Sequence, residues 1–219
     1  MKTPAAPCKP ALRWNGLTRF YDRVMALTMR EDQFWTLLLN PIRGLKPRYV
    51  LDVGGGTGTQ AMQLHRLFPK ADVFGLDGDE TILVLARQKN TAEGWPVTLE
   101  QGLSTSLPYP DQTMDLVTCS LLLHHLSDED KEQTIREIGR VLSPGGSLAL
   151  VDWGKPANEA MRVLFYGLQL FDGFDTTTAN VQGRIPNMLY DGGFHPITQT
   201  GQVNTIFGTL RLYHALKPV

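Results

Sequence analysis

The stretch LDVGGGTGTQ, residues Leu51–Gln60, carries four glycines directly after an apolar run and decides the fold of this chain. The apolar run RYVLDV, residues 48–53, predicts a buried strand that ends at the glycines. Apolar residues then recur at helical spacing over 61–68, and Thr57 and Gln60 stand at the spacing of a capping box. A strand, a glycine loop and a helix in this order indicate an α/β protein whose loop backbone approaches a ligand.

The same pattern continues downstream, where more apolar runs alternate with helix signals. We expect strands over 71–77, 97–102, 114–123 and 147–153, and helices over about 80–89 and 128–142. Asp79 and Ser127 are the expected N-caps of these helices, and SPGG ends the second helix. A helix over 161–171 and a β-hairpin over 195–217 follow. This alternation predicts a doubly wound, mostly parallel sheet with helices on both faces.

Composition excludes several classes of protein. The 219 residues are 42% hydrophobic and 20% charged with a net charge of −1, so no broad basic surface for nucleic acid is expected. Two cysteines, Cys8 and Cys119, do not make a disulfide framework, which favours a reducing, cytoplasmic location. The N-terminus has no signal-peptide pattern, and no apolar run approaches the ~20 residues that cross a bilayer. We therefore expect no stable membrane insertion.

Two phosphate-binding interpretations of the glycine loop are excluded or weakened. A P-loop needs glycine-lysine-Ser/Thr at the helix start, but Gly58 is followed by Thr59 and Gln60. The dinucleotide fingerprint needs glycine or alanine where Thr59 stands, and Asp52 would repel a pyrophosphate. An NAD(P)-dependent oxidoreductase stays open as the less favoured alternative.

What remains is G-x-G-x-G, formed by Gly54, Gly56 and Gly58, with Asp52 two residues upstream. Glycines let a ligand lie against the backbone, a helix N-terminus favours a carboxylate, and the aspartate favours an ammonium or sulfonium. S-adenosylmethionine carries all of these groups and no phosphate. Asp77, nineteen residues after Gly58, ends the second strand and suits the two hydroxyls of a ribose, a feature that NAD enzymes share.

Four segments resemble the successive motifs of class I S-adenosylmethionine-dependent methyltransferases: VLDVGGGTG, VFGLD, LPYPDQTMDLVTCSLLLHHL and REIGRVLSPGGSLALVDWG. The resemblance runs from about Tyr49 to Gly154. The most similar group is the ubiquinone/menaquinone C-methyltransferase-like one, whose members begin with a Tyr-Asp helix (Tyr21 and Asp22 here) and end in a GF…FGT…KP hairpin. It implies a seven-stranded Rossmann-like sheet in the order 3-2-1-4-5-7-6, with the last strand antiparallel, and methyl transfer to a small-molecule acceptor.

The resemblance also assigns residues of this chain to the cofactor, from its methionine part to its adenine. The set is Asp52, Gly54, Gly55, Gly56, Thr57 and Gly58 for the methionine part, Asp77 and Gly78 for the ribose, Gly102, Leu103 and Ser104 for the adenine, with Ser120, Leu121 and Tyr21 around it. The family usually has an acidic residue where Leu103 stands, and leucine can only pack on the adenine ring. Either Ser104 or a backbone carbonyl replaces that acceptor, or adenine recognition is looser.

The candidates for chemistry lie after the fourth strand and in the insertion before the hairpin. His124 and His125 are candidate general bases if the acceptor must lose a proton, and otherwise end a strand or fill the pocket wall. On an extended segment their side chains would point apart, so the pair is no metal site, and we expect no metal. Asp152 and Trp153 end the fifth strand and are candidates to face the acceptor. The insertion carries Phe165, Tyr166, Phe171 and Phe174, which are more often core at helical spacing but favour a lipophilic or aromatic acceptor if they line the site.

These assignments predict a disordered leader over 1–13 and one domain over 14–219. Within the domain we expect an N-terminal helical cap (14–46), a cofactor-binding core (47–154) and an acceptor-side helix with the C-terminal hairpin (155–219). The protein is expected to be a monomer or a homodimer. The Leu103 departure keeps a second alternative open, a non-catalytic protein that binds S-adenosylmethionine.

Overall fold

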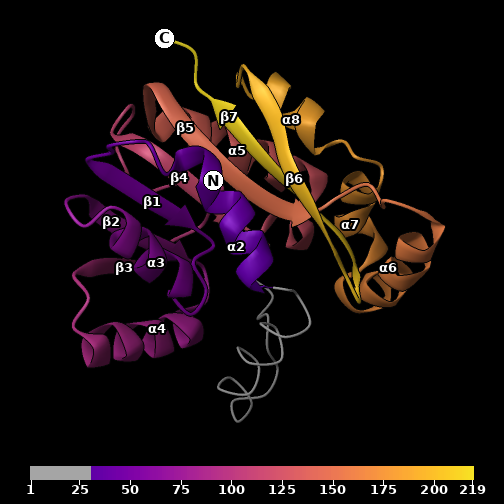
Figure 1. Ribbon diagram of the computed structural model, residues 1–219, viewed down its shortest axis with the longest axis horizontal. Coiled ribbons are helices and arrows are strands. Elements are labelled where there is room, and N and C mark those ends of the chain that lie inside the picture. Colours follow the sequence, from indigo (N-terminus) through magenta and orange to yellow (C-terminus); the bar gives the residue numbers. More distant parts are fainter. Residues whose placement is uncertain (1–30) are drawn as a thin grey trace, which may run out of the picture.

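The structure is a computed structural model, shown in Figure 1, that describes residues 31–219 apart from the side chains of residues 31, 32, 171 and 172. The expected leader, the first part of the expected helical cap and Tyr21 therefore lie outside the described residues. The described chain forms one central sheet with helices packed against both of its faces.

Seven strands form this sheet in the order β3-β2-β1-β4-β5-β7-β6, which confirms the expected fold and strand order. Pairing is parallel from β3 through β5, and β7 runs antiparallel to both β5 and β6. The strands are β1 (Tyr49–Val53), β2 (Asp72–Asp77), β3 (Val97–Gln101), β4 (Met114–Ser120), β5 (Leu142–Trp153), β6 (Ile197–Thr205) and β7 (Gly208–Leu216).

Helices cover each face because successive side chains of the buried strands point to opposite sides. On one face lie α2 (Glu31–Leu39), α3 (Thr59–Leu67) and α6 (Glu159–Asp172), with α4 (Glu80–Glu93) beside α3 over β2 and β3. On the other face lie α5 (Asp128–Val141), α7 (Phe174–Val181) and α8 (Ile185–Asp191). The 3-10 turns η1 (Asn40–Ile42) and η2 (Leu123–His125) follow α2 and β4.

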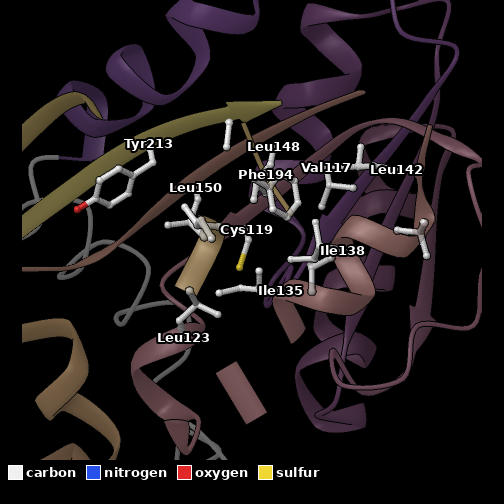
Figure 2. Close-up of a cluster of buried hydrophobic side chains, with 14 of the residues drawn as sticks. Val117, Cys119, Leu123, Ile135, Ile138, Leu142, Leu148, Leu150, Phe194 and Tyr213 are labelled. Atoms are coloured by element: carbon white, nitrogen blue, oxygen red, sulfur yellow. The ribbon is translucent and has the colours of Figure 1, made fainter. Parts of the chain in front are cut away.

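The core on the α5 side is continuous from the sheet to the helices (Figure 2). Cys119 of β4 and Leu150 of β5 pack there with Ile135 of α5 and Leu123 of η2, and all of them are buried. Leu116, the residue before Val117 on β4, points to the opposite face of the sheet and packs on the side of α2 and α3. Burial of apolar side chains on both faces fixes the register of β4 and thereby the position of the loop that follows it.

The carboxyl ends of β1, β4 and β5 lie at one edge of the sheet because these strands are parallel neighbours. Val53 at the end of β1 pairs with Cys119 of β4, and Ser120 pairs with Val151 of β5. The glycine loop, η2 and the end of β5 are consequently brought together at this edge, where ligands bind in open α/β sheets.

Several sequence-based boundaries are wrong. The strand expected over 114–123 ends at Ser120, and the helix expected over about 80–89 continues to Glu93. Helix α3 begins at Thr59 after Gly58, whose φ of 76° places it in the left-handed region with no side-chain cap, so Thr57 and Gln60 form no capping box. Helix α5 ends at Val141, just before SPGG, as expected, but strand β5, expected over 147–153, already begins at Leu142 and includes the SPGG segment. Gly145 and Gly146 keep pairing there through hydrogen bonds with the backbone of Lys217, beyond the end of β7.

Two helices were not predicted, whereas the expected caps, α6 and the closing hairpin are confirmed. Helix α7, FDTTTANV, contains consecutive threonines with low helix propensity. The hydroxyls of Thr177 and Thr178 donate to the carbonyls of Gly173 and Phe174, so these side chains bond within the helix itself. Across residues 31–219 we find no helix with the length and apolar character needed to cross a membrane.

Candidate active site

The glycine loop between β1 and α3 folds back on the end of β2. The amides of Gly54 and Gly55 both donate to the carbonyl oxygen of Leu76, at 2.8 and 3.0 Å. Gly56 has a φ of 52°, and a Cβ there would meet no heavy atom within 4 Å, so its Cα faces open space. A ligand can therefore lie directly against the backbone at Gly56.

Asp77, the last residue of β2, holds this loop in place. Its Oδ2 accepts the amide hydrogen of Gly56 at 2.8 Å, and its Oδ1 accepts that of Asp79 at 2.9 Å. The neighbouring Gly78 accepts a hydrogen bond from the Gln101 side chain at 3.3 Å. Each carboxylate oxygen retains a second lone pair, so Asp77 is able to bind hydroxyl donors while it positions the loop.

Asp52 lies beneath the glycine loop and is completely buried. Its Oδ1 accepts the hydroxyl hydrogen of Thr118 at 2.8 Å, but its Oδ2 has no hydrogen-bond partner among residues 31–219. A Cβ at Gly55 would lie 3.2 Å from this oxygen, so the backbone there comes close to it. Burial, which outweighs the Thr118 hydrogen bond, raises the pKa of Asp52 to about 7. A cationic or hydrogen-bond-donating group of a ligand bound at the loop would give Asp52 Oδ2 the partner that it lacks.

The loop after β3 is anchored to α5 and presents an apolar side chain. The hydroxyls of Ser104 and Thr134 lie 2.9 Å apart and share a hydrogen bond, and Gly102 donates its amide hydrogen to the carbonyl of Asp77. The Leu103 carbonyl accepts the amide hydrogen of Ser106, and the Leu103 side chain is 40% exposed. The Ser104 hydroxyl, one of the expected replacements for the acidic residue, and the Leu103 carbonyl therefore each already take part in a hydrogen bond.

The backbone is strained where β4 ends. Leu121 has a φ of 54°, which is rare for a residue with a Cβ and recurs at functional sites. Its amide donates to the carbonyl of Val151, and the next side chain, Leu122, packs where a Cβ of Gly54 would be, 3.0 Å away. The hydroxyl of Ser120 is buried without a hydrogen-bond partner in the described part of the chain. This turn places η2 beside the glycine loop.

The two adjacent histidines do not point apart, because η2 is a 3-10 turn rather than an extended segment. Their rings lie 3.9 Å apart, with His124 buried and His125 exposed. The Nδ1 atom of His124 lies 2.8 Å from the Oδ1 atom of Asp152, which is also buried. Sequence reasoning named both residues but missed their pairing. The available signal was that His124 follows β4 and that Asp152 lies at the carboxyl end of β5, the neighbouring strand.

Aromatic side chains continue from this pair toward α6. The Trp153 ring centroid lies 6.4 Å from that of His124 and 5.5 Å from that of Phe165, and both Trp153 and Phe165 are buried. Tyr166 and Phe174 are exposed instead, at 46% and 45%. Of the four aromatic candidates in the insertion, the structure brings Phe165 to the site. The side chain of Phe171 is not among those described.

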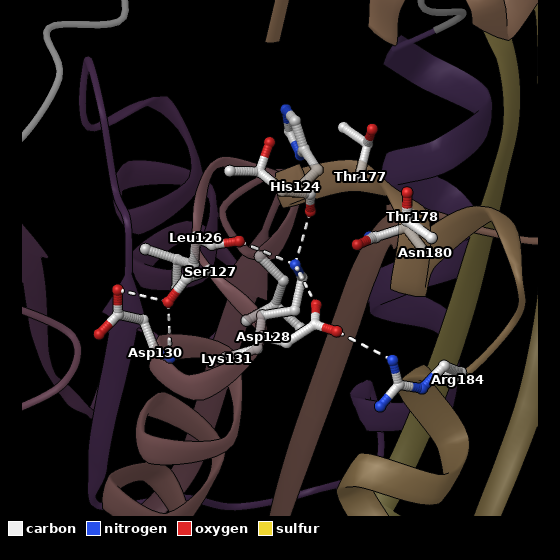
Figure 3. A network of polar contacts seen from close by, with 12 residues as sticks. His124, Leu126, Ser127, Asp128, Asp130, Lys131, Thr177, Thr178, Asn180 and Arg184 are labelled. Atoms are coloured by element: carbon white, nitrogen blue, oxygen red, sulfur yellow. Dashed lines mark hydrogen bonds and ion pairs between the residues drawn. The ribbon is translucent and has the colours of Figure 1, made fainter. Parts of the chain in front are cut away.

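A buried lysine connects η2 and α5 to α7 (Figure 3). The ammonium of Lys131 donates to the carbonyls of Leu126 and Thr176, at 2.8 and 2.6 Å, and lies 3.3 Å from Asp128. Burial lowers the pKa of Lys131, and the neighbouring Asp128 opposes this shift. Asp128 also pairs with Arg184 at the start of α8. This network fixes α7 against the turn that carries His124.

Replacing Lys131 by methionine is expected to loosen α7 and to lower the free energy of unfolding by roughly 1–3 kcal/mol. Two buried carbonyls would lose a donor, which costs more than the net value of an ordinary hydrogen bond. Hydrogen exchange of the amides in 174–181, together with urea unfolding, measures the effect. The matched control is Arg184→Gln, which removes an exposed ion pair worth about 0–1 kcal/mol. Equal protection of α7 in the Lys131 variant and the control would refute this role.

Residues 50–146 match the family model of a methyltransferase domain. Among curated proteins, a demethylmenaquinone methyltransferase of Deinococcus radiodurans is 39% identical over 119 residues, 54% of this chain and 48% of that protein. The aligned part thus spans about half the length of that relative. The ubiquinone/menaquinone biosynthesis C-methyltransferase UbiE of Shewanella baltica is 27% identical over 203 residues, 83% of this chain and 80% of that protein.

The fold recurs among solved structures. The YcgJ protein of Bacillus subtilis superposes with a TM-score of 0.71 at 18% identity, covering 85% of this chain and 99% of the other. At this identity the likeness speaks for the fold alone. The matched domain begins in β1 and ends in β5, so it contains the glycine loop, Asp77 and η2.

Proposed function

We propose that this protein is an S-adenosylmethionine-dependent methyltransferase that methylates a carbon of a small aromatic acceptor of the quinol type, because residues 50–146 match a methyltransferase domain. The family match and the methyltransferase names of the relatives support methyl transfer, and neither the oxidoreductase nor the non-catalytic alternative finds support in them.

The residues at the carboxyl edge of the sheet fit the cofactor. The single observation that carries this proposal is the buried Oδ2 atom of Asp52, which has no partner within residues 31–219 and lies under a loop that is open at Gly56. A carboxylate in this position suits the ammonium or sulfonium of S-adenosylmethionine. Asp77 would accept the ribose hydroxyls, and Gly102, Leu103 and Ser104 would flank the adenine, with Leu103 packing on the ring. The bound cofactor supplies an activated methyl group.

The acceptor is proposed from the relatives and from the aromatic side chains. Both cited relatives are named for quinone methylation. For the present chain we propose an acceptor of the same chemical class. Trp153 and Phe165 are buried with ring centroids 5.5 Å apart, and they place apolar aromatic side chains beside the site. The protein's contribution is to align the acceptor carbon with the methyl group in a site that excludes water.

A transfer assay tests this function. We expect the full chain, with methyl-labelled S-adenosylmethionine and a short-chain demethylmenaquinol, to produce a quinol with one labelled methyl group on a ring carbon. Catechol and a primary amine serve as probes for O- and N-methylation. Labelled product from catechol or the amine alone would refute carbon methylation, and no labelled product from any probe would favour the non-catalytic alternative.

The finer sequence-based predictions stay proposals. They are the division into a core over 47–154 and an acceptor-side part over 155–219, the monomeric or homodimeric state, the lack of nucleic-acid partners and the cytoplasmic location. Tyr21 as a residue that closes over the cofactor, and Ser120 and Leu121 as cofactor contacts, belong to the same set.

A further inference from the structure

Three buried side chains from β1, β4 and α3 each have a polar atom without a hydrogen-bond partner within residues 31–219. The atoms are Asp52 Oδ2, Ser120 Oγ and Gln60 Nε2. Folded proteins pair nearly all of their buried polar atoms, so each exception needs an explanation. If the three atoms surround one place, a single polar ligand there would supply the missing partners.

Asp52 and Ser120 point to the same face of the sheet. The hydroxyl of Thr118 donates to Asp52 across the pair of β1 and β4, so these two side chains share a face. Ser120 follows Thr118 by two residues in the same strand and therefore points to that face as well. Leu116, two residues before Thr118, packs there with side chains of α2 and α3. The two unpartnered oxygens thus lie under these helices, at the ends of neighbouring strands.

Gln60 points toward the same place because of its position in α3. Helix α3 contacts β1 and β2, with α4 on one side over β2 and β3 and α2 on the other side over β5 (Figure 1). Ala61 lies against β2, 3.4 Å from where a Cβ of that strand's glycine would be. Met62 lies toward α4, and a Cβ at Gly58 would meet it at 3.4 Å and Ala86 of α4 at 3.3 Å. Gln60 is about 200° from Met62 around the helix, so it faces away from α4, over the ends of β1 and β4.

The backbone around Gln60 also favours an anion. Gln60 is the second residue of α3, whose N-cap Gly58 makes no side-chain hydrogen bond. The first amides of a helix have no helical partners, and its N-terminus carries a partial positive charge. Gln60 is 6% exposed, so its unpartnered amide is held inside the protein next to these backbone donors. Side-chain and backbone donors therefore lie together on the face of the sheet that carries the carboxylate of Asp52.

On the basis of the proposed binding of S-adenosylmethionine, we propose that Gln60 binds the α-carboxylate of its methionine part and selects ligands that carry the intact amino acid. The ammonium and the carboxylate of an amino acid are attached to one carbon, so both arrive together. Asp52 is the anionic partner for the ammonium, and the Ser120 hydroxyl is able to accept a second of its hydrogens. Gln60 Nε2 and the first amides of α3 are the donors for the carboxylate.

A neutral donor suits this position better than a cation. Lysine or arginine at position 60 would pair with the nearby Asp52 and leave the ammonium of the ligand without its anion. Glutamine donates two hydrogens and has no charge, so it serves the carboxylate and leaves Asp52 free. The ligand reaches the site along the glycine loop, where the backbone faces open space at Gly56.

Calorimetry with two ligands on the full chain tests this proposal. The ligands are S-adenosylhomocysteine and its decarboxylated analogue, which lacks only the α-carboxylate. Gln60→Leu is expected to weaken S-adenosylhomocysteine binding roughly 10- to 100-fold, the range for hydrogen bonds to a charged group. The Kd of the decarboxylated analogue should change less than about threefold, because this ligand has no carboxylate to lose.

Two further variants and a stability measurement separate binding from a structural effect. Gln63→Leu, one turn farther along α3 and partly exposed, is the matched control and should bind both ligands as the wild type does. Ser120→Ala should weaken both ligands by a similar factor, because both retain the ammonium. Leucine at position 60 removes an unpaired buried amide, so ligand-free Gln60→Leu should unfold at the same or a higher urea concentration than the wild type.

The outcomes distinguish this proposal from the proposed function. Equal weakening of both ligands in Gln60→Leu, or unchanged binding of S-adenosylhomocysteine, overturns the role of Gln60 while cofactor binding stands. Equal affinity of the wild type for the two ligands overturns recognition of the carboxylate. A wild-type protein that binds neither S-adenosylmethionine nor S-adenosylhomocysteine overturns the proposed function, and the role of Gln60 falls with it.

Discussion

Replacing Asp77 by asparagine is expected to weaken S-adenosylmethionine binding by roughly 10- to 100-fold, the range for hydrogen bonds to a charged group, about 1.5–3 kcal/mol. Asparagine offers one acceptor oxygen where Asp77 offers two, so it cannot serve both the Gly56 and Asp79 amides and the ribose hydroxyls. The substitution therefore removes direct contacts and also loosens the loop.

Calorimetry of S-adenosylhomocysteine binding measures this effect. The matched control is Asp72→Asn, at the opposite end of the same strand, where the exposed side chain lies far from the carboxyl edge. We expect the control to bind as the wild type does. Equal affinities of the Asp77 variant and the control would show that the ribose assignment is wrong.

Replacing Asp52 by asparagine is expected to weaken cofactor binding at least tenfold, yet to stabilise the cofactor-free protein at pH 8 by roughly 1–3 kcal/mol. The reason is that burial raises the pKa of Asp52 from 3.8 to about 7. Between these two values the unfolded chain has released this proton and the folded chain has kept it. The contribution of Asp52 to stability is therefore full below pH 3.8 and is lost as the pH rises toward and through 7.

Urea unfolding between pH 4 and 8 measures this slope, which the Asp52→Asn variant should lack. Cofactor binding adds a second test, because a cationic group near Asp52 favours the ionised carboxylate and should expel its proton. Calorimetric enthalpies at pH 6.5 should then depend on the ionisation enthalpy of the buffer in the wild type and not in the variant. Identical buffer dependence in both proteins would contradict the placement of Asp52 under the cofactor.

Much of the fold follows from the sequence because its elements are strongly patterned. The apolar runs of β1 and β4 and the capped helices α4 and α5 are local signals, and a parallel sheet leaves few ways to arrange them. Helix α7 was missed because its three threonines disfavour helix, and its stability comes from contacts with η2 and β5 that no local pattern carries. The start of β5 was missed because its glycines pair with the chain after β7.

The candidate site also has a part that the sequence predicts and a part that it does not. Asp52 and Asp77 could be placed from sequence because each belongs to a strand whose carboxyl end borders the glycine loop. That Asp52 Oδ2 has no hydrogen-bond partner within residues 31–219 could not be predicted, because this depends on which donors surround the buried side chain. The contact of His124 with Asp152 joins residues that are 28 positions apart, and it depends on the register between β4 and β5.

The central claim is that the glycine loop with Asp52 and Asp77 binds S-adenosylmethionine, and a calorimetric titration of the full chain tests it most directly. We predict saturable binding of S-adenosylmethionine and S-adenosylhomocysteine to one site, with a Kd on the order of micromolar, about −8 kcal/mol. NADH and NADPH titrated under the same conditions should give no comparable heat. Saturable binding of NADH with no binding of S-adenosylmethionine would contradict the account.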